Sequence, residues 1–211
     1  SLSSLAVSLL ISLPLGTISA VRRGTCLDSL GMAIAMLGIS VPNFWLAYLL
    51  IMLFSLHLDL LPVAGFGSGG DLEHTLLPAL TLGLAASAVT NRVVRASMVE
   101  ALSQDYTMAA IARGLPRRSV VLRHAMRNAL LPIITVIGLN FSYLINGSAV
   151  VEAIFAWPGM GNLMVRSIYD RDYPLILGCM LFVALLMLIL NLAVDLCCYY
   201  LNPRLRYARE N

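Results

Sequence analysis

The sequence has 211 residues, of which 59% are hydrophobic and 12% are charged, and its formal net charge is +3. Soluble domains carry about 25% charged residues, so this composition excludes an ordinary soluble domain and indicates a membrane protein or a fragment of one. The net positive charge is no evidence for a polyanionic partner, because membrane topology explains where the arginines lie.

Five apolar blocks are long enough to cross a hydrocarbon core about 30 Å thick, which takes about 20 helical residues. Each block is continuous, whereas a membrane β-barrel shows alternating segments of about 10 residues. The sequence therefore predicts an all-α, polytopic membrane helical bundle with five transmembrane helices in one domain, residues 1–211. The blocks are residues 2–21, 30–56, 75–94, 129–151 and 174–200.

The chain begins with Ser1 and is apolar from Leu2 onward, with no basic segment before the first block. This pattern disfavours a cleavable signal peptide. We expect the chain to begin inside a larger protein, so that the first block is a later span of the whole.

All 14 positively charged residues are arginines, and most of them fall on one side of the predicted bundle. By the positive-inside rule that side faces the cytoplasm, and the acidic connections face outward. The cytoplasmic set is Arg22, Arg23, Arg92, Arg95, Arg113, Arg117, Arg118, Arg123, Arg127, Arg204, Arg206 and Arg209. The outward set is Arg166, Arg171, Asp59, Asp71, Glu73, Glu152, Asp170 and Asp172.

Polar residues within the last two blocks are few. Polar groups in hydrocarbon face other helices or a water-filled cavity, so Asn140 and Asn146 are candidates for a translocation path or for hydrogen bonds between helices. Asn191 and Asp195 lie four residues apart on one helix face. We expect Asp195 to form an ion pair with a cytoplasmic arginine rather than to relay protons.

Small residues recur at spacings that allow close helix packing, in Gly31, Ala35 and Gly38 and in the stretch 83–88. Three prolines interrupt or begin blocks, and we expect kinks there. These prolines are Pro42, Pro78 and Pro132.

Two outward connections differ in kind. Residues 65–70 are rich in glycine and predict a flexible turn. Residues 152–173 combine aromatics with a Pro-Gly turn and an amphipathic run from residue 160 to 168, on which Leu163, Met164 and Ile168 share a face. This second connection fits either an interfacial anchor or a lid over a central path. The gate candidates are Phe155, Trp157, Pro158 and Gly159.

The cysteines and histidines carry no recognisable site chemistry. The four cysteines show no C-x-x-C spacing and are read as small packing residues, and no two histidines have metal-ligand spacing. No glycine-rich loop has the Lys-Ser/Thr that a phosphate cradle requires. We therefore expect no catalytic residue, no metal site and no cofactor bound by this chain.

One stretch, residues 104–132, resembles two short helices around Gly114 and carries several arginines. A DNA-reading helix-turn-helix is one interpretation, because Ala110, Gly114 and Val120 have the required spacing. Such a motif must enter a major groove about 12 Å wide, and a loop tethered at both ends to membrane spans is poorly placed to do so. We therefore do not expect nucleic-acid binding.

Several ordered motifs instead resemble the permeases of bacterial ATP-binding-cassette importers for dipeptides, oligopeptides and nickel. "AAIARGLPRRSV" followed by "RHAMRNALLP" resembles their cytoplasmic EAA loop. The resemblance continues in the same order through nearly the whole chain, in "SVPNFWLAYLL", "VRASMVEALSQDY", "VEAIFAWPGMG", "RDYPLI", "NLAVDL" and "NPRLR".

This resemblance implies a type I importer permease that pairs with a second related permease, sits on two ATPase subunits and receives substrate from an extracytoplasmic binding protein. It also implies an inner-membrane location, a coupling loop at residues 95–128, and ATP and Mg bound by the ATPase subunits only. The residues implied for ATPase coupling are Ala109, Ala110, Gly114, Leu115, Arg117, Arg118 and Arg123. Gly114 is expected to permit both the turn and a close approach, and the arginines to contact an acidic rim.

One position departs from the wider superfamily, because Met108 stands where that family has a glutamate. This removes one candidate ion pair. The resemblance favours peptides as the substrate, with nickel as an alternative within the same family. An ion-gradient-driven transporter is the alternative of another class, and Asp195 is the one acid that suits it.

Overall fold

The computed structural model describes residues 1–67 and 71–201, without the side chains of Asn146, Gly147 and Leu201. Every regular element in these ranges is helical, which confirms the all-α class. The elements are α1 (Leu2–Val21), α2 (Cys26–Ser40), α3 (Asn43–Leu50), η1 (Ile51–His57), α4 (Leu72–Ser103), α5 (Asp105–Ala112), α6 (Arg117–Ser119), η2 (Val120–Ala125), α7 (Met126–Ile154), α8 (Met160–Asp170) and α9 (Tyr173–Leu201).

Four helices among the described residues are long and apolar enough to cross a membrane, and a bent pair of helices raises the number of spans to five. The bent pair is α2 with α3, which meet at 103°. The bend follows from Pro42, which disfavours a helical conformation at the preceding residue, and Val41 is extended accordingly. The kink predicted at Pro42 is thus confirmed. Helices α4 and α7 continue through Pro78 and Pro132, and the kinks at these two prolines stay predictions.

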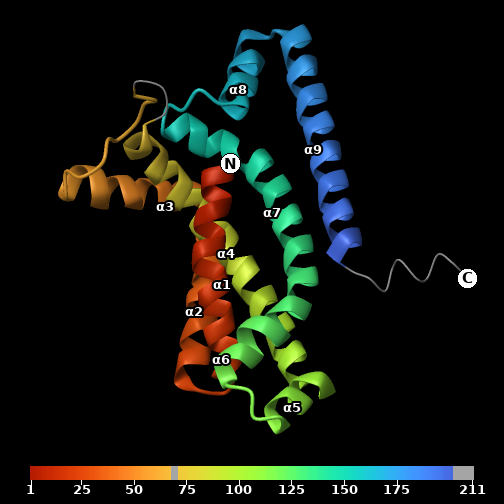
Figure 1. Cartoon of the computed structure of the whole chain (residues 1–211). Coiled ribbons are helices and arrows are strands. Elements are labelled where there is room, and N and C mark those ends of the chain that lie inside the picture. Colours follow the sequence, from red (N-terminus) through yellow and green to blue (C-terminus); the bar gives the residue numbers. More distant parts are fainter. Residues whose placement is uncertain (68–70, 202–211) are drawn as a thin grey trace, which may run out of the picture.

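The core of the bundle is the packing of α1 along α4 (Figure 1). The buried face of α1 is a stripe of small residues, nearly one per turn, which lets the two backbones approach closely. A Cβ atom at Gly16 would lie 2.7 Å from Val94, and one at Gly83 would lie 2.7 Å from Val7. The stripe consists of Ser4, Ser8, Ser12, Gly16, Ser19 and Ala20.

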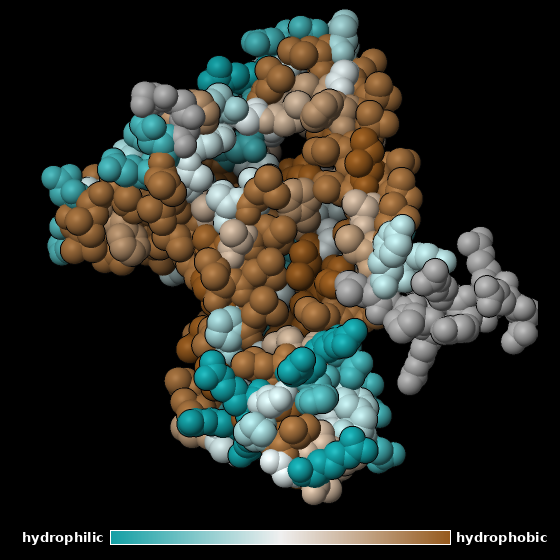
Figure 2. Space-filling view, in the orientation of Figure 1, coloured by the Kyte–Doolittle hydropathy of each residue, from teal (hydrophilic) through white to brown (hydrophobic). Residues whose placement is uncertain are grey.

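The surface is hydrophobic in the middle of the bundle and hydrophilic at the end that holds α5 and α6 (Figure 2). We call this the arginine-rich end, after Arg22, Arg95, Arg117 and Arg118. The opposite end holds α8. Most of α9 is exposed, with only 6% of its most apolar window buried. This helix therefore presents its apolar surface to lipid or to another subunit.

Two segments, η1 and η2, are π-helical. Segment η2 lies between α6 and α7 without a break, so the chain is helical from Arg117 to Ile154. Wide turns of this kind occur mostly at functional positions. Here η2 joins the connection predicted to couple to an ATPase directly to a membrane-spanning helix.

Candidate functional site

The predicted helix–glycine–helix unit is present at the arginine-rich end, where α5 lies beyond the ends of the long helices (Figure 1). Gly114 has φ +77°, a left-handed conformation that glycine adopts without steric cost. The N–H of Gly114 donates to the carbonyl of Ile111 and that of Leu115 to the carbonyl of Ala110, which terminates α5. A Cβ atom at Gly114 would meet nothing of this chain within 4 Å, so the close approach to a docked partner stays a prediction.

The base of this unit is fixed to the bundle. Thr107 is fully buried, and its hydroxyl donates to the carbonyl of Ala101 at the end of α4 over 2.8 Å. Ala110 and Val120 are also buried, which holds α5 against η2. Burial of one face therefore leaves the opposite face of α5 free for a partner.

That free face is apolar although it stands at the hydrophilic end of the molecule. Met108 is 61% exposed and Ile111 54%, and Leu115 and Ala109 are exposed beside them. An apolar patch surrounded by polar residues is typical of a protein–protein contact. Met108, which lacks the charge of the superfamily glutamate, contributes apolar surface to it.

Of the three arginines predicted to couple to an ATPase, two line the same cleft and the third does not. Arg123 is exposed on η2. Arg117 and Arg118 line a cleft against the end of α1, and the Arg117 guanidinium donates to the carbonyl of Val21 over 3.4 Å. The structure thus turns Arg117 toward the membrane-spanning bundle.

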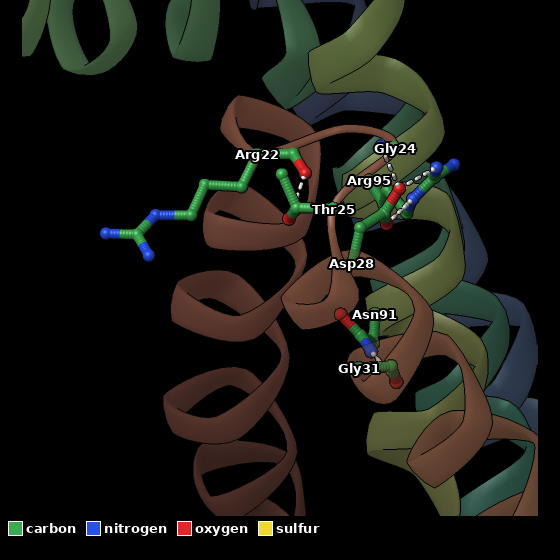
Figure 3. Close-up of polar contacts among 7 residues, drawn as sticks. All are labelled: Arg22, Gly24, Thr25, Asp28, Gly31, Asn91 and Arg95. Carbon is green, nitrogen blue, oxygen red and sulfur yellow. Dashed lines mark hydrogen bonds and ion pairs between the residues drawn. The ribbon is translucent and has the colours of Figure 1, made fainter.

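An ion pair that the sequence analysis missed joins α2 to α4 at the same end (Figure 3). Arg95 Nε lies 2.5 Å from Asp28 Oδ1, and Arg95 Nη2 lies 2.7 Å from Asp28 Oδ2. The backbone N–H of Gly24 also donates to Asp28. Asp28 is only 5% exposed, and burial of its charge requires compensation. The two-point contact with the Arg95 guanidinium supplies it. An acidic residue on the side that holds most of the arginines was the signal available in the sequence.

Farther along α2 from the ion pair, α2 stays in close contact with the bundle. Asn91 Nδ2 donates to the carbonyl of Gly31 over 3.5 Å (Figure 3). A Cβ atom at Gly31 would collide with Ser19 at 2.6 Å, and one at Gly38 would lie 3.1 Å from Ala88. The predicted packing role of these glycines is confirmed. We call this contact of α2 with α4 and α1 the α2 seam.

A cavity of about 460 Å³ lies at the far end of the α2 seam, at the break between α2 and α3. Its polar lining includes Ser40, Asn43 and Asn140, together with the half-exposed Tyr143. Asn140 Nδ2 donates to Thr90 Oγ1 over 2.6 Å and is 8% exposed. The predicted interhelical hydrogen bond of Asn140 is confirmed, and its position in a cavity wall also suits a path.

The connection at the opposite end contains the predicted amphipathic helix, α8. The gate candidates in this connection differ from one another in how far they are buried. Phe155 is 2% exposed and lies in a core cluster with Leu77 and Leu144, so it is a packing residue. Trp157 is half-buried, and its ring packs edge-to-face with the ring of Phe66, with the ring centroids 4.8 Å apart. Phe155 is therefore buried within this chain, and its role as a gate residue stays a prediction.

Hydrogen bonds hold this connection in place. The N–H of Gly65 donates to the carbonyl of Phe155, which bonds the start of the glycine-rich segment to this connection. The N–H of Asn162 donates to the carboxylate of Glu152 over 3.0 Å, and the Asn162 amide donates to the carbonyl of Trp157. Gly159 lies so close to Glu152 that a Cβ atom would collide with the carboxylate. Pro158, which lies between Trp157 and Gly159 in the sequence, is exposed.

The remaining candidates lie on exposed or undescribed surfaces. Leu163 and Ile168 of α8 are exposed, which leaves the apolar face of this helix uncovered by the chain. Asn191 and Asp195 are exposed on α9. The side chain of Asn146, residues 68–70 of the glycine-rich turn and the C-terminal Arg204, Arg206 and Arg209 lie outside the described residues, so the ion pair of Asp195 stays a prediction.

Comparisons with known proteins agree with this architecture. The glutathione transport system permease protein GsiC of Escherichia coli (strain K12) is 44% identical over 206 residues, which is 98% of this chain and 66% of that protein. The corresponding protein of Salmonella paratyphi A is 42% identical over the same length. The chain thus spans just under two thirds of the length of these curated relatives.

Two solved structures show the fold. Inward-facing MetNI methionine ABC transporter matches with a TM-score of 0.77 at 18% identity, over 94% of this chain and 89% of the other. An amino acid ABC transporter with histidines matches with a TM-score of 0.66 at 14% identity, over 93% and 88%. The family described as binding-protein-dependent transport system inner membrane component matches residues 12–207. The chain belongs to this family and is a multi-pass permease of the inner membrane.

Proposed function

We propose that the chain forms, with a second homologous permease, the membrane path of an ATP-driven importer for di- or oligopeptides. Two ATPase subunits carry ATP and Mg, an extracytoplasmic binding protein delivers the substrate, and this chain has no catalytic site of its own. The observation that carries the proposal is the α5–Gly114–α6 unit, which offers an exposed apolar face beyond the bundle while its base is buried.

The structure also supports a route by which motion of this unit reaches the path. Segment η2 and α7 continue from the unit without a loop, and Asn140 of α7 lines the cavity. On the other side, Arg95 of α4 holds Asp28 at the start of α2, and α2 ends at the same cavity. Displacement of the unit is therefore transmitted to the cavity along two helices.

Peptides are the favoured substrate because the curated relatives are named for the transport of glutathione, which is a small peptide. Nickel remains the alternative within the family. Uptake of labelled glutathione and dipeptides by cells carrying the complete transporter supports the proposal. Uptake of radioactive nickel without peptide uptake supports the alternative. The ligand that co-purifies with the binding protein gives an independent answer.

The coupling role is tested by Gly114→Trp in the complete transporter. The exposed apolar face of Met108, Ile111 and Leu115 is called the docking face here. The bulky residue obstructs this face, so we expect uptake to fall to background while the protein still inserts into the membrane. Membrane insertion is measured by immunoblotting of membrane fractions and coupling by substrate-stimulated ATP hydrolysis in proteoliposomes.

Gly24→Trp is the matched control. Gly24 has φ +79° and, like Gly114, open space around a Cβ atom, so the backbone cost of the two substitutions is the same. Gly24 lies in the α1–α2 turn, outside the proposed docking face, and we expect the Gly24→Trp transporter to retain most of its uptake. Normal uptake and normal ATPase assembly in Gly114→Trp would reject the coupling assignment.

A gradient-driven mechanism is tested at Asp195, the acid that suits it. We expect uptake to persist in Asp195→Asn and to stop when ATP is depleted. Loss of uptake in Asp195→Asn at normal ATP, with collapse of the proton gradient having the same effect on the parent protein, would favour a secondary transporter over an ATP-driven importer.

A further inference from the structure

A second hollow, of about 430 Å³, lies between the end of α1 and the α6–η2 segment. We call it the α1–η2 cleft. Its floor is apolar and includes Ile18, Val121 and Leu122. Its charged lining consists of Arg22, Arg117 and Arg118. The α1–η2 cleft thus has an apolar floor and a positively charged rim.

The three guanidinium groups are not neutralised within the described part of the chain. The ion pair recorded there joins Arg95 to Asp28, and none of the residues that line the cleft is acidic. Figure 3 shows the side chain of Arg22 extending away from the Asp28–Arg95 pair. Arg117 is held over the cleft by its bond to the carbonyl of Val21. Within the described residues, the rim therefore carries positive charge that no acidic side chain neutralises.

The depth of the cleft in the membrane follows from the ends of two candidate spans. One span, Leu2–Val21, ends at the rim, and another, Arg117–Ile145, begins there. The arginines consequently lie at headgroup depth, and the floor lies one to two turns farther into the hydrocarbon. Ile18 and Leu122 are 49% and 53% exposed, so the floor is open to an acyl chain.

From this geometry we propose that the α1–η2 cleft is a binding site for an anionic phospholipid. The headgroup phosphate contacts Arg22, Arg117 and Arg118, and an acyl chain lies on Ile18 and Leu122. Guanidinium groups suit phosphate because they donate in a fixed planar fork, and basic pockets between spans hold anionic headgroups. The bound lipid ties α1 to the start of the helix that carries the coupling unit.

This site assigns Arg117 and Arg118 to lipid rather than to an ATPase, and it does not depend on which substrate is imported. The positive-inside rule explains the side on which these arginines lie, but not their convergence on one apolar hollow with Arg22. Other exposed arginines of the same end, Arg92 and Arg113, do not line it.

The test uses the intact transporter, purified with its partner subunits and delipidated in mild detergent. Phosphatidylglycerol or phosphatidylethanolamine is then added back in mixed micelles, and bound lipid is counted by native mass spectrometry. We expect the parent protein to prefer phosphatidylglycerol. The triple variant Arg22→Gln, Arg117→Gln, Arg118→Gln should lose that preference by about tenfold or more, because each arginine near an anionic headgroup contributes to attraction.

The triple variant Arg92→Gln, Arg113→Gln, Arg127→Gln is the matched control, since it removes the same charge from exposed arginines outside the cleft. It should bind phosphatidylglycerol like the parent. Ile18→Trp removes no charge but fills the apolar floor, and it should also weaken lipid binding. This variant keeps the proposal testable if the cleft triple variant assembles poorly.

Three results would overturn the proposal. Equal phosphatidylglycerol binding by the cleft and control triple variants would show that the arginines act only through overall charge. Displacement of the lipid by millimolar inorganic phosphate would indicate a simple anion site. Loss of the ATPase subunits from the cleft triple variant, with lipid binding unchanged, would return Arg117 and Arg118 to the ATPase contact.

Discussion

The two connections that protrude from the bundle are built in opposite ways. At the arginine-rich end, the turn at Gly114 is surrounded by open space and α5 leaves an apolar face exposed. At the opposite end, the segment from Phe155 to Asn162 is bonded to Glu152 and to the glycine-rich connection, and its glycines have no room for a side chain. The segment from Phe155 to Asn162 is thus held by contacts within the chain, whereas the connection at Gly114 leaves an exposed face for a partner to contact.

The open connection is nevertheless firmly based. Thr107 ties α5 to the end of α4, and the Asp28–Arg95 pair ties α4 to α2 two turns earlier. A partner that pushes on the exposed face therefore moves helices rather than a loop. Rigidity at the arginine-rich end therefore lies beneath the docking face, whereas at the opposite end it lies within the connection itself.

The largest effect is expected from Arg95→Met, which leaves the Asp28 carboxylate buried without its partner. Breaking such a pair costs about 3 kcal/mol in free energy of unfolding, measured as a lower midpoint of thermal unfolding of the purified complex. Arg92→Met on the exposed side of α4 is the control and should change stability by less than about 0.5 kcal/mol.

The double variant Asp28→Leu, Arg95→Met separates stability from coupling. It removes both charges, so most of the lost stability should return, while the fixed angle between α2 and α4 is lost and uptake per ATP hydrolysed stays low. If Arg95→Met lowers the midpoint of thermal unfolding no more than Arg92→Met does, the Asp28–Arg95 pair does not hold the arginine-rich end in place.

The next effect probes the self-contained connection. A Cβ atom at Gly161 would lie 2.5 Å from Ala149 Cα, a backbone atom that cannot move aside alone. Gly161→Ala should therefore lower the free energy of unfolding by about 2 kcal/mol through overpacking, read from the same thermal midpoint. Gly178→Ala in α9 is matched, because a Cβ atom there meets nothing within 4 Å, and stability should hold or rise. Equal midpoints for the two variants would contradict a tightly packed outward connection.

The smallest effect is expected at the base of α5. Thr107→Val keeps the shape of the side chain but removes the buried hydroxyl bond to Ala101, which costs about 1 kcal/mol. Its control is Thr135→Val, whose exposed hydroxyl donates to the carbonyl of Leu131 in its own helix and lies 3.6 Å from Cys198 Sγ. We expect Thr107→Val to reduce substrate-stimulated ATP hydrolysis more than its modest shift in thermal midpoint suggests. Unaltered stimulation would show that α5 needs no fixed base.

Local patterns in the sequence were sufficient for the helices and for the turn at Gly114, because helix length, proline position and glycine conformation depend on neighbouring residues. The packing role of Gly31 and Gly38 was likewise readable from spacing. The serine stripe of α1, with Ser4, Ser8 and Ser12 four residues apart, carried the same signal and was missed.

Contacts between distant residues were not readable in this way. Asp28 and Arg95 are separated by 67 positions, and neither residue type alone shows which partner it has. The direction of Arg117 toward α1 and the burial of Phe155 also depend on how helices are arranged in space. The type of a residue and its position in the chain therefore could not show that Arg117 contacts α1 or that Phe155 packs in the core, and the coupling and gate roles of these two residues stay predictions.

The uninterrupted helix from Arg117 to Ile154 sets the direction in which a docked partner acts. Because η2 joins α6 to α7 without a loop, the orientation of the coupling unit about the helix axis depends on how many residues the π-helical turn contains. Each helical residue advances the chain by about 100°. Removal of one residue from η2 would thus rotate the docking face by about a quarter of a circle relative to the face of α7 that lines the cavity. The number of residues in η2 therefore fixes the direction in which the docking face points.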